Sequence, residues 1–226
     1  MVHSSLSSMK LVPGGPETVI RGFLKALGER GALLLPALSY RYVHAMNPVF
    51  DVLRTPSNIG RIPEYFRTRP GTMRSVNPTH SVSGVGPVAD SMLREHDLDE
   101  TPCGPHSPFR LLRDRGGQVI FLGCGLAPNT SMHAVEELVN PPYLFGDMIE
   151  YRIVMPDGTE RKARCRRHNF VGFAQRYERI GPLMKDGGLL VGQVLAATVH
   201  VLEAPAMWER ALEAYGRDPL YFVDRL

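Results

Sequence analysis

The 226-residue chain contains few cysteines, and this scarcity excludes several classes of protein. Its three cysteines, Cys103, Cys124 and Cys165, are odd in number and widely spaced, which argues against a disulfide framework and a zinc ribbon. A reducing compartment fits this usage best. No apolar run reaches transmembrane length, and the N-terminus lacks the charged-then-apolar layout of a signal peptide. We therefore expect a cytoplasmic protein that does not associate with a membrane.

Several motifs are also missing. The sequence has no Gly-x-Gly-x-x-Gly, no Walker A motif and no Gly-x-Ser-x-Gly elbow, which argues against dinucleotide sites, nucleoside triphosphate sites and serine hydrolases. A large charge imbalance is absent as well. The net charge of +3 is too small to indicate a nucleic-acid partner, but it is compatible with a small anionic ligand such as a phosphorylated cofactor.

The residues that are present predict an α/β fold. With 43% apolar residues, the chain can bury one substantial core, so we expect a single domain. Asp157-Gly158 between two strand-like runs is a strong hairpin signal. Strands that alternate with helices predict a layered α/β/α domain with a mixed central sheet and an antiparallel hairpin. The predicted helices are 16–28, 62–67, 85–96, 170–184 and 205–215. The predicted strands are 32–36, 119–122, 150–155 and 160–167, and the segment 188–202 is β-rich.

The stretch from Gly123 to Glu137 contains the best candidate for a general base. An apolar strand ends at Gly123, and Asn129 or Thr130 can cap a helix that begins at Ser131. His133 would then lie in the first helical turn, where the positive end of the helix dipole disfavours an imidazolium. Glu136 and Glu137 follow at i+3 and i+4 on the same face and could hold or polarise the ring. A neutral, oriented imidazole beside a carboxylate suits a general base, although an ordinary surface helix would show the same pattern.

Other polar stretches keep alternatives open. His133-x-x-Glu136 could be a metal-ligand pair completed by His80 or His106, but no second matching pair exists, so we predict no metal site. Cys103 could form a thiolate nucleophile, whereas the apolar setting of Cys124 suggests a core position. His80 could also be a second base, a hydrogen-bond donor or a core residue.

Two longer segments also suggest roles. The irregular segment 37–60 is longer than structural loops usually are, so we expect it to cover a site. The basic run from Arg161 to Arg167 is typical of a solvated edge strand, or it contacts phosphate.

An ordered set of short motifs resembles the aminoglycoside 3-N-acetyltransferases over nearly the whole chain. The motifs are Val2-His3-Ser4-Ser5-Leu6-Ser7-Ser8, Gly14-Gly15, Gly60-Arg61-Ile62-Pro63-Glu64, Arg74-Ser75-x-x-Pro78, Ser107-Pro108, Leu122-Gly123-x-Gly125 and Asn129-Thr130-Ser131-x-His133-x-x-Glu136. The resemblance implies a cytoplasmic, acetyl-CoA-dependent α/β enzyme, unrelated to the GCN5-type acetyltransferases, that acetylates an amine directly without an acyl-enzyme. The acceptor would be an aminoglycoside or a related small amine, and the oligomeric state, including a homodimer, stays open.

The resemblance also implies roles for individual residues. His133 would be the base that deprotonates the acceptor amine, with Glu136 orienting it and His80 as a second catalytic residue. Coenzyme A would be held by the loop and helix start after the first strand and by a second polar stretch: His3, Ser4, Ser5, Leu6, Gly15, Arg74, Ser75 and Ser81. We expect Asn129, Thr130 and Glu137 to contact the acceptor.

This chain departs from the family pattern in three places. Members usually carry a further N-terminal segment, so the resemblance implies a single domain over residues 1–226 that lacks it. Asn77 stands where members often have histidine, and His80 is a candidate replacement. The turn before Ser107-Pro108 lacks the glutamate that resistance enzymes often carry. These departures make a catalytically impaired protein that still binds coenzyme A the first alternative. The His133-x-x-Glu136 pair gives a second alternative, a metal-dependent hydrolase that uses His133 and Glu136.

Overall fold

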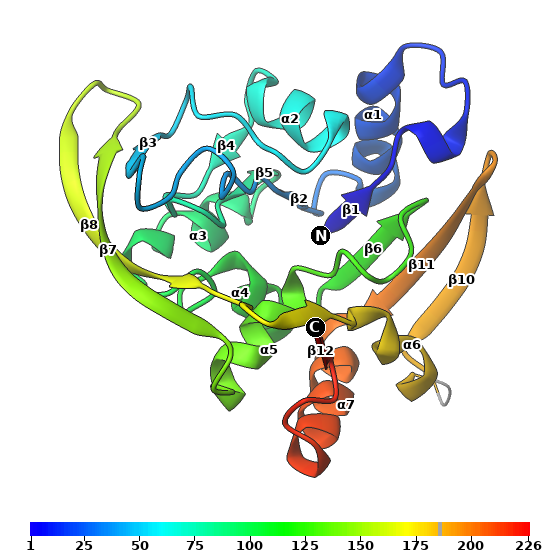
Figure 1. Ribbon diagram of the computed structural model, residues 1–226. Coiled ribbons are helices and arrows are strands. Elements are labelled where there is room, and N and C mark those ends of the chain that lie inside the picture. The colour runs from blue at the N-terminus through cyan, green and yellow to red at the C-terminus, as the bar shows by residue number, and fades with distance from the viewer. Residues whose placement is uncertain (185–186) are drawn as a thin grey trace.

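A four-stranded mixed sheet lies at the centre of the computed structural model, which describes residues 1–184 and 187–226 (Figure 1). The strand order is β1-β6-β11-β10. Strands β1 (Val2–Ser4) and β6 (Gln118–Leu122) are parallel, whereas β11 (Ala197–Glu203) pairs antiparallel with β6 and with β10 (Leu189–Val194). The predicted strand 119–122 and the predicted β-rich segment 188–202 are thus confirmed, the latter as the two strands β10 and β11.

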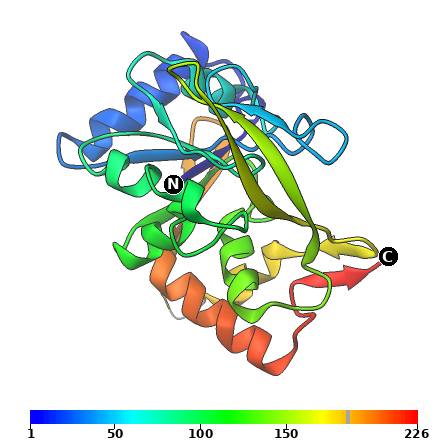
Figure 2. The same ribbon diagram turned by 90° about the vertical axis from the view of Figure 1, so that its left-hand side faces the viewer.

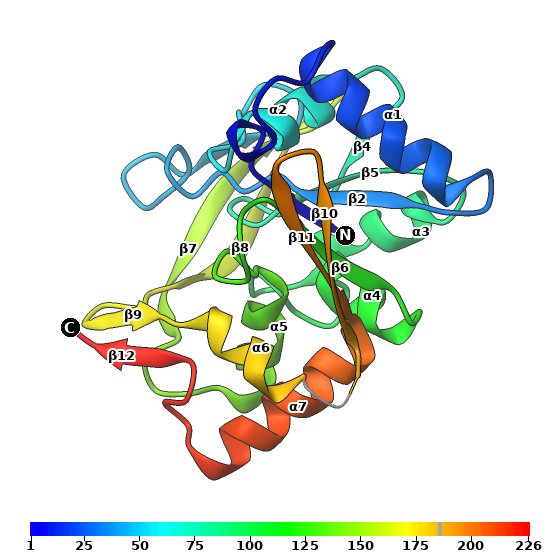
Figure 3. The same cartoon turned by 90° about the vertical axis from the view of Figure 1, so that its right-hand side faces the viewer.

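Helices cover both faces of this sheet because the side chains of β6 alternate. Val119 and Phe121 pack into the core beneath α4 (Pro108–Asp114), α5 (Ser131–Val139) and α7 (Ala204–Arg217). Ile120 and Leu122 point to the opposite side, where they pack with apolar side chains of α1 (Gly15–Leu27) and α2 (Arg61–Thr68). Figure 3 shows α1 and α7 on opposite sides of the sheet. The predicted mixed α/β class and layered arrangement are therefore confirmed.

Two three-stranded sheets flank the central one. Strand β5 (Val82–Val85) pairs antiparallel with β2 (Leu33–Pro36) and with β4 (Met73–Arg74). The predicted hairpin is confirmed as the long strands β7 (Phe145–Val154) and β8 (Glu160–His168), and Figure 2 shows it running along one side of the molecule. The segment 37–60 is largely irregular, as expected, apart from β3 (Val49–Asp51), which adds to β7 in parallel.

Two predicted helices form only in part because tertiary contacts override local pattern. The segment 85–96 begins inside β5 and continues only as the short helix α3 (Ala89–Leu93), followed by the 3-10 turn η2 (His96–Leu98). The chain turns at Gly86, whose φ is +120°. The segment 170–184 holds strand β9 (Phe173–Gln175), the 3-10 turn η3 (Tyr177–Arg179) and the short helix α6 (Ile180–Leu183). Strand β9 pairs with β12 (Val223–Arg225) from the C-terminal tail, a partner that no local pattern reveals.

The remaining elements agree with the prediction or lie outside it. The helices predicted at 16–28, 62–67 and 205–215 correspond to α1, α2 and α7. A short 3-10 turn, η1 (Ser7–Met9), follows β1. Among the described residues, no helix is both long and apolar enough to cross a membrane.

Candidate functional site

A cavity of about 680 Å³ opens beside the C-terminal end of β1 and the first turn of α5. Much of its wall comes from parts of the chain that are distant in sequence: His3 and Ser4 of β1, the segment 38–44, Thr79 and His80, the segment 124–133 that includes the start of α5, and residues from the end of β8 to Tyr177. Three of the predicted residues, His3, His80 and His133, therefore meet around one space. Asn129 and Thr130 line the same wall.

The turn between β6 and α5 places His133 in this wall. Gly123 and Gly125 adopt positive φ values of +71° and +63°, which glycine tolerates without a steric penalty. The helix begins at Ser131, as predicted, so His133 is its third residue. The expected side-chain cap is wrong: Thr130 occupies the cap position, but its side chain makes no capping hydrogen bond.

Glu136 is fully buried and holds the His133 ring from behind. Its Oε2 lies 3.2 Å from His133 Nδ1 and accepts a 2.6 Å hydrogen bond from the Tyr177 hydroxyl. Its Oε1 accepts 3.0 Å hydrogen bonds from the hydroxyls of Tyr143 and Tyr215. Burial and the nearby Glu136 carboxylate raise the pKa values of all three tyrosines, so they stay protonated donors. Four donors thus fix the carboxylate in place.

This network sets the tautomer of His133. The Nδ1 atom faces Glu136 Oε2 and lies 2.9 Å from the Tyr177 hydroxyl oxygen. Because Tyr177 donates its proton to Glu136, Nδ1 has only acceptors around it and must carry the ring proton. Within the part of the chain that is described, Nε2 has no hydrogen-bond partner. Its lone pair is left for a molecule in the cavity.

Glu137 contacts a second histidine of the cavity wall, His168, and is not itself part of that wall. Its Oε1 is 2.8 Å from His168 Nε2. The same carboxylate accepts hydrogen bonds from the Thr101 hydroxyl and the Cys103 backbone N–H, at 2.5 and 2.8 Å. Burial raises the pKa of Glu137 to about 6. The structure thus ties Glu137 to the turn at 101–103 and does not bring it to the cavity, contrary to its predicted contact with the acceptor.

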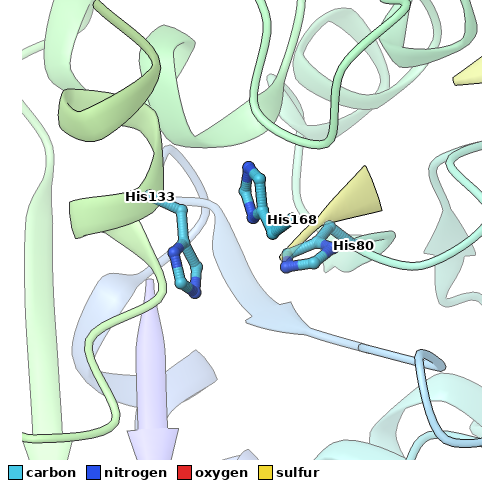
Figure 4. Close-up of side chains that lie close together, drawn as sticks. All are labelled: His80, His133 and His168. Atoms are coloured by element: carbon cyan, nitrogen blue, oxygen red, sulfur yellow. The ribbon is translucent and has the colours of Figure 1, made fainter. Parts of the chain in front are cut away.

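His80 and His168 complete a group of three imidazoles, shown in Figure 4. The ring centroid of His133 lies 5.5 Å from that of His80 and 4.9 Å from that of His168, and the latter two are 5.0 Å apart. Thr79 Oγ1 contacts His80 Nδ1 at 2.9 Å. Burial is the main cause that lowers the pKa values of His80 and His168 well below the ordinary value, so both rings are neutral at pH 7.

Strand β1 and the segment before α5 contribute polar atoms that the protein itself does not satisfy. His3 stacks on Phe121 at 5.0 Å, and burial lowers its pKa to about 3. Among the described residues, the side-chain atoms His3 Nε2, Ser4 Oγ and Asn129 Oδ1 are buried without a hydrogen-bond partner. An unsatisfied buried polar group costs about 1–3 kcal/mol, so these atoms favour binding of a polar ligand.

The structure does not bring the other predicted cofactor residues to this cavity. Arg74 is partly buried and donates to Ser81 Oγ and to the carbonyl oxygens of Val52, Thr55 and Ala37. Desolvation of the guanidinium lowers its pKa to about 9. The Ser81 hydroxyl donates to the Ala37 carbonyl, and the Ser75 hydroxyl contacts His96 Nδ1 at 2.9 Å. The residues Ser5, Leu6, Gly15, Arg74, Ser75 and Ser81 are not part of the wall.

The structure also shows where the residues proposed as an alternative nucleophile or as metal ligands lie. Cys103 is fully buried outside the cavity wall, and burial raises its thiol pKa well above the ordinary value. Cys124 packs against the main core, as expected, and also lines the cavity, and burial raises its pKa to about 11. His106 bonds to Asp99 at 2.9 Å and holds the turn. Because hydrogen bonds occupy both Glu136 oxygens, His133 and Glu136 do not form a ligand pair.

The basic run on β8 is mostly an exposed edge with ion pairs. Arg161 pairs with Asp97 and Lys162 with Glu150, at 2.9 and 2.7 Å. Only Arg167 of the run lines the cavity. Among the described lining residues it is the one fixed cation, and no carboxylate lines the wall.

Sequence reasoning missed His168 and the three tyrosines. His168 directly follows the basic run, and a polar side chain at the end of a predicted strand could have identified it as a candidate site residue. Tyr143, Tyr177 and Tyr215 carried no signal, because each comes from a different segment and only the fold assembles them around Glu136.

Comparisons with known proteins agree with this architecture. The family model described as aminoglycoside 3-N-acetyltransferase matches residues 1–215. The chain is 35% identical to aminoglycoside N(3)-acetyltransferase VII of Streptomyces paromomycinus, over 90% of this chain and 80% of that protein. It is 30% identical to aminoglycoside N(3)-acetyltransferase VIII of Streptomyces fradiae, with the same coverage.

Solved structures give the same result. A structure described as AAC-IIIb binary with CoASH superimposes with a TM-score of 0.82 at 26% identity, covering 96% of this chain and 89% of that one. The apoenzyme of aminoglycoside acetyltransferase AAC(3)-IVa gives a TM-score of 0.80 at 26% identity, covering 98% of this chain and 82% of that one. Together with the family match over residues 1–215, these likenesses confirm the predicted family and its acyltransferase class. The chain belongs to the aminoglycoside 3-N-acetyltransferase family.

Proposed function

We propose that this protein transfers the acetyl group of acetyl-CoA directly to an amine of an aminoglycoside or a related amino compound, with His133 as the general base. The proposal rests chiefly on the His133 ring. Glu136 and Tyr177 fix its Nδ1 side, and its Nε2 lone pair faces a cavity large enough for a substrate. The relatives named as aminoglycoside N(3)-acetyltransferases support the reaction class.

The bonds and protons balance in the proposed acetyl transfer. The neutral acceptor amine attacks the thioester carbonyl, forming a C–N bond, while His133 Nε2 takes the proton that the amine loses. The tetrahedral intermediate collapses, the C–S bond breaks, and coenzyme A leaves with the sulfur electron pair. The imidazolium formed at His133 is stabilised by the Glu136 carboxylate behind it. The imidazolium then returns the proton to the thiolate, which regenerates the base.

The polar atoms that the protein leaves unpaired indicate where the co-substrate binds. Ser4 Oγ and His3 Nε2 can contact the amide groups of the coenzyme A arm, and Arg167 at the cavity wall suits its phosphates. The structurally similar AAC-IIIb in complex with CoASH supports coenzyme A as the carrier. The three free cysteines fit the reducing cytoplasm, where we place this enzyme.

The acceptor side of the cavity has limited negative charge. Asn129 Oδ1 offers one buried acceptor and Thr130 one hydroxyl. The described wall has no carboxylate for the several cationic groups of an aminoglycoside. We therefore include amino compounds with fewer charges in the acceptor class.

Acetyl transfer can be tested by following thiol release from acetyl-CoA with a panel of aminoglycosides and simple amines. We expect His133→Ala to lower kcat/KM by about 10²–10⁴-fold, the usual contribution of a positioned general base. The matched control is His106→Ala, because that ring bonds to Asp99 away from the cavity. Equal activity in wild type and His133→Ala would refute the role of this base. Coenzyme A binding by calorimetry without turnover on any acceptor would instead indicate the catalytically impaired protein.

A further inference from the structure

We propose that His80, His133 and His168 form a binding site for one transition-metal ion, such as Zn²⁺ or Co²⁺, at the wall of the cavity. One ring nitrogen from each histidine can be chosen so that the three atoms lie within 4.8 Å of one another. The rings come from the turn before β5, from α5 and from β8, and they gather at one place (Figure 4). Imidazole is the preferred protein ligand for zinc, cobalt, nickel and copper in such settings.

Each of the three rings already has a partner on one nitrogen, as metal-bound histidines usually do. Glu136 and Tyr177 hold His133 Nδ1, Glu137 holds His168 Nε2, and Thr79 holds His80 Nδ1. Two of these partners are carboxylates. The nitrogens left over are therefore Nε2 of His133, Nε2 of His80 and Nδ1 of His168.

The His168 Nδ1 atom is an independent indication that a ligand belongs here. It is buried and has no hydrogen-bond partner among the described residues. Its side chain is only 5% exposed. Because the Glu137 carboxylate accepts a hydrogen bond from Nε2, the ring proton lies on Nε2 and Nδ1 carries the lone pair. A metal ion would accept the lone pair that nothing else uses.

The geometry needs only a small adjustment. Zinc binds imidazole nitrogen at about 2.0–2.1 Å in tetrahedral sites, which places ligand nitrogens about 3.4 Å apart. One nitrogen of each ring already lies within 4.8 Å of the other two, so side-chain rotations that move the rings by roughly 1 Å would bring three ligand nitrogens to that spacing. The fourth position would face the cavity and stay open to water or another small ligand.

Metal binding would inhibit acetyl transfer, and this part of the inference rests on the proposed function. The ion takes the same His133 Nε2 lone pair that deprotonates the amine. Metal and acceptor should therefore compete, so Zn²⁺ should raise the apparent KM for the amine. The binding itself does not depend on the transferase role.

The experiment is a titration of the metal-free full chain with Co²⁺ in the absence of acetyl-CoA, followed by visible absorption and calorimetry. We expect one ion per chain and an intense absorption band typical of four-coordinate Co²⁺. His168→Gln should weaken binding by more than the 10–100-fold caused by loss of an outer-sphere partner. Glu137→Gln, which keeps all three ligands, should weaken it by about 10–100-fold. The matched control is His44→Gln, because His44 is exposed and lines the same cavity outside the cluster.

Two outcomes would overturn the site. One is the absence of saturable binding to folded wild-type protein. The other is equal affinity in wild type, His168→Gln and Glu137→Gln, with circular dichroism showing that the variants are folded. A protein that binds Co²⁺ at the three histidines but acetylates no amine would refute the proposed function and leave the metal site intact. An active enzyme without a metal site would do the reverse.

Discussion

Tyr177 and Tyr215 make a matched pair that tests how the fold positions the base. Both hydroxyls donate to Glu136, at 2.6 and 3.0 Å, and both side chains are buried. Only the Tyr177 oxygen also contacts His133, at 2.9 Å from Nδ1. Replacing either residue by phenylalanine removes one hydrogen bond to a buried carboxylate. Each variant should therefore lose about 1.5–3 kcal/mol of unfolding free energy.

The catalytic effects of the two substitutions should differ. In Tyr177→Phe the His133 ring loses one of its two anchors, and a misplacement of about 1 Å can cost up to about 10²-fold in rate. We expect kcat to fall by about 10–10²-fold, equivalent to about 1.4–2.7 kcal/mol. Tyr215→Phe leaves both contacts of Nδ1 in place, so its kcat should fall by less than about threefold.

The assay is thiol release from acetyl-CoA at saturating acceptor, combined with urea unfolding of each variant. The KM for acetyl-CoA should stay constant in both variants, because neither tyrosine acts on the co-substrate in the proposed mechanism. Equal losses of kcat in the two variants would refute the reasoning, since they would show that the carboxylate network acts only through stability. A loss in Tyr215→Phe alone would place the base on another residue.

Three further predictions concern residues away from the base. Arg74→Lys should lower the unfolding free energy by a few kcal/mol, because one ammonium cannot serve the carbonyl groups that the guanidinium fork reaches, while the KM for acetyl-CoA stays unchanged in kinetic assays. A changed KM would contradict this structural role. Gly86→Ala should destabilise the fold by about 1–3 kcal/mol in urea unfolding, since φ is +120° and a Cβ would lie 2.4 Å from the Gly31 carbonyl oxygen; wild-type stability would refute this. Burial lowers the pKa of His96 to about 4, so the unfolded chain takes up a proton below about pH 6.5 while the folded ring stays neutral. Stability supplied by His96 is then present above about pH 6.5 and lost as the pH falls, by about 3 kcal/mol between pH 7 and pH 4. His96→Gln should flatten that part of the stability profile, and an unaltered slope would contradict the assignment.

Local pattern predicted those parts of the fold in which sequence neighbours decide the structure. The apolar strand that ends at Gly123 and the helix that begins at Ser131 were predicted correctly, because glycine and the helix start act within a few residues. The hairpin at Asp157-Gly158 was predicted for the same reason. The segment 170–184 was not, because its strand exists only through pairing with Val223–Arg225, about 50 residues away.

The same distinction between local pattern and tertiary packing applies to the candidate site. The order of residues is enough to place His133 in the first turn of a helix with Glu136 on the same face, because the helical repeat fixes neighbours at i+3. The ordered motifs of the family are likewise present in the sequence. Three features required the folded chain: Glu136 and not Glu137 holds the base, three tyrosines from separate segments surround that carboxylate, and His80 and His168 lie beside His133. These contacts depend on how distant strands and helices pack around the central sheet, and local periodicity carries no information about such packing.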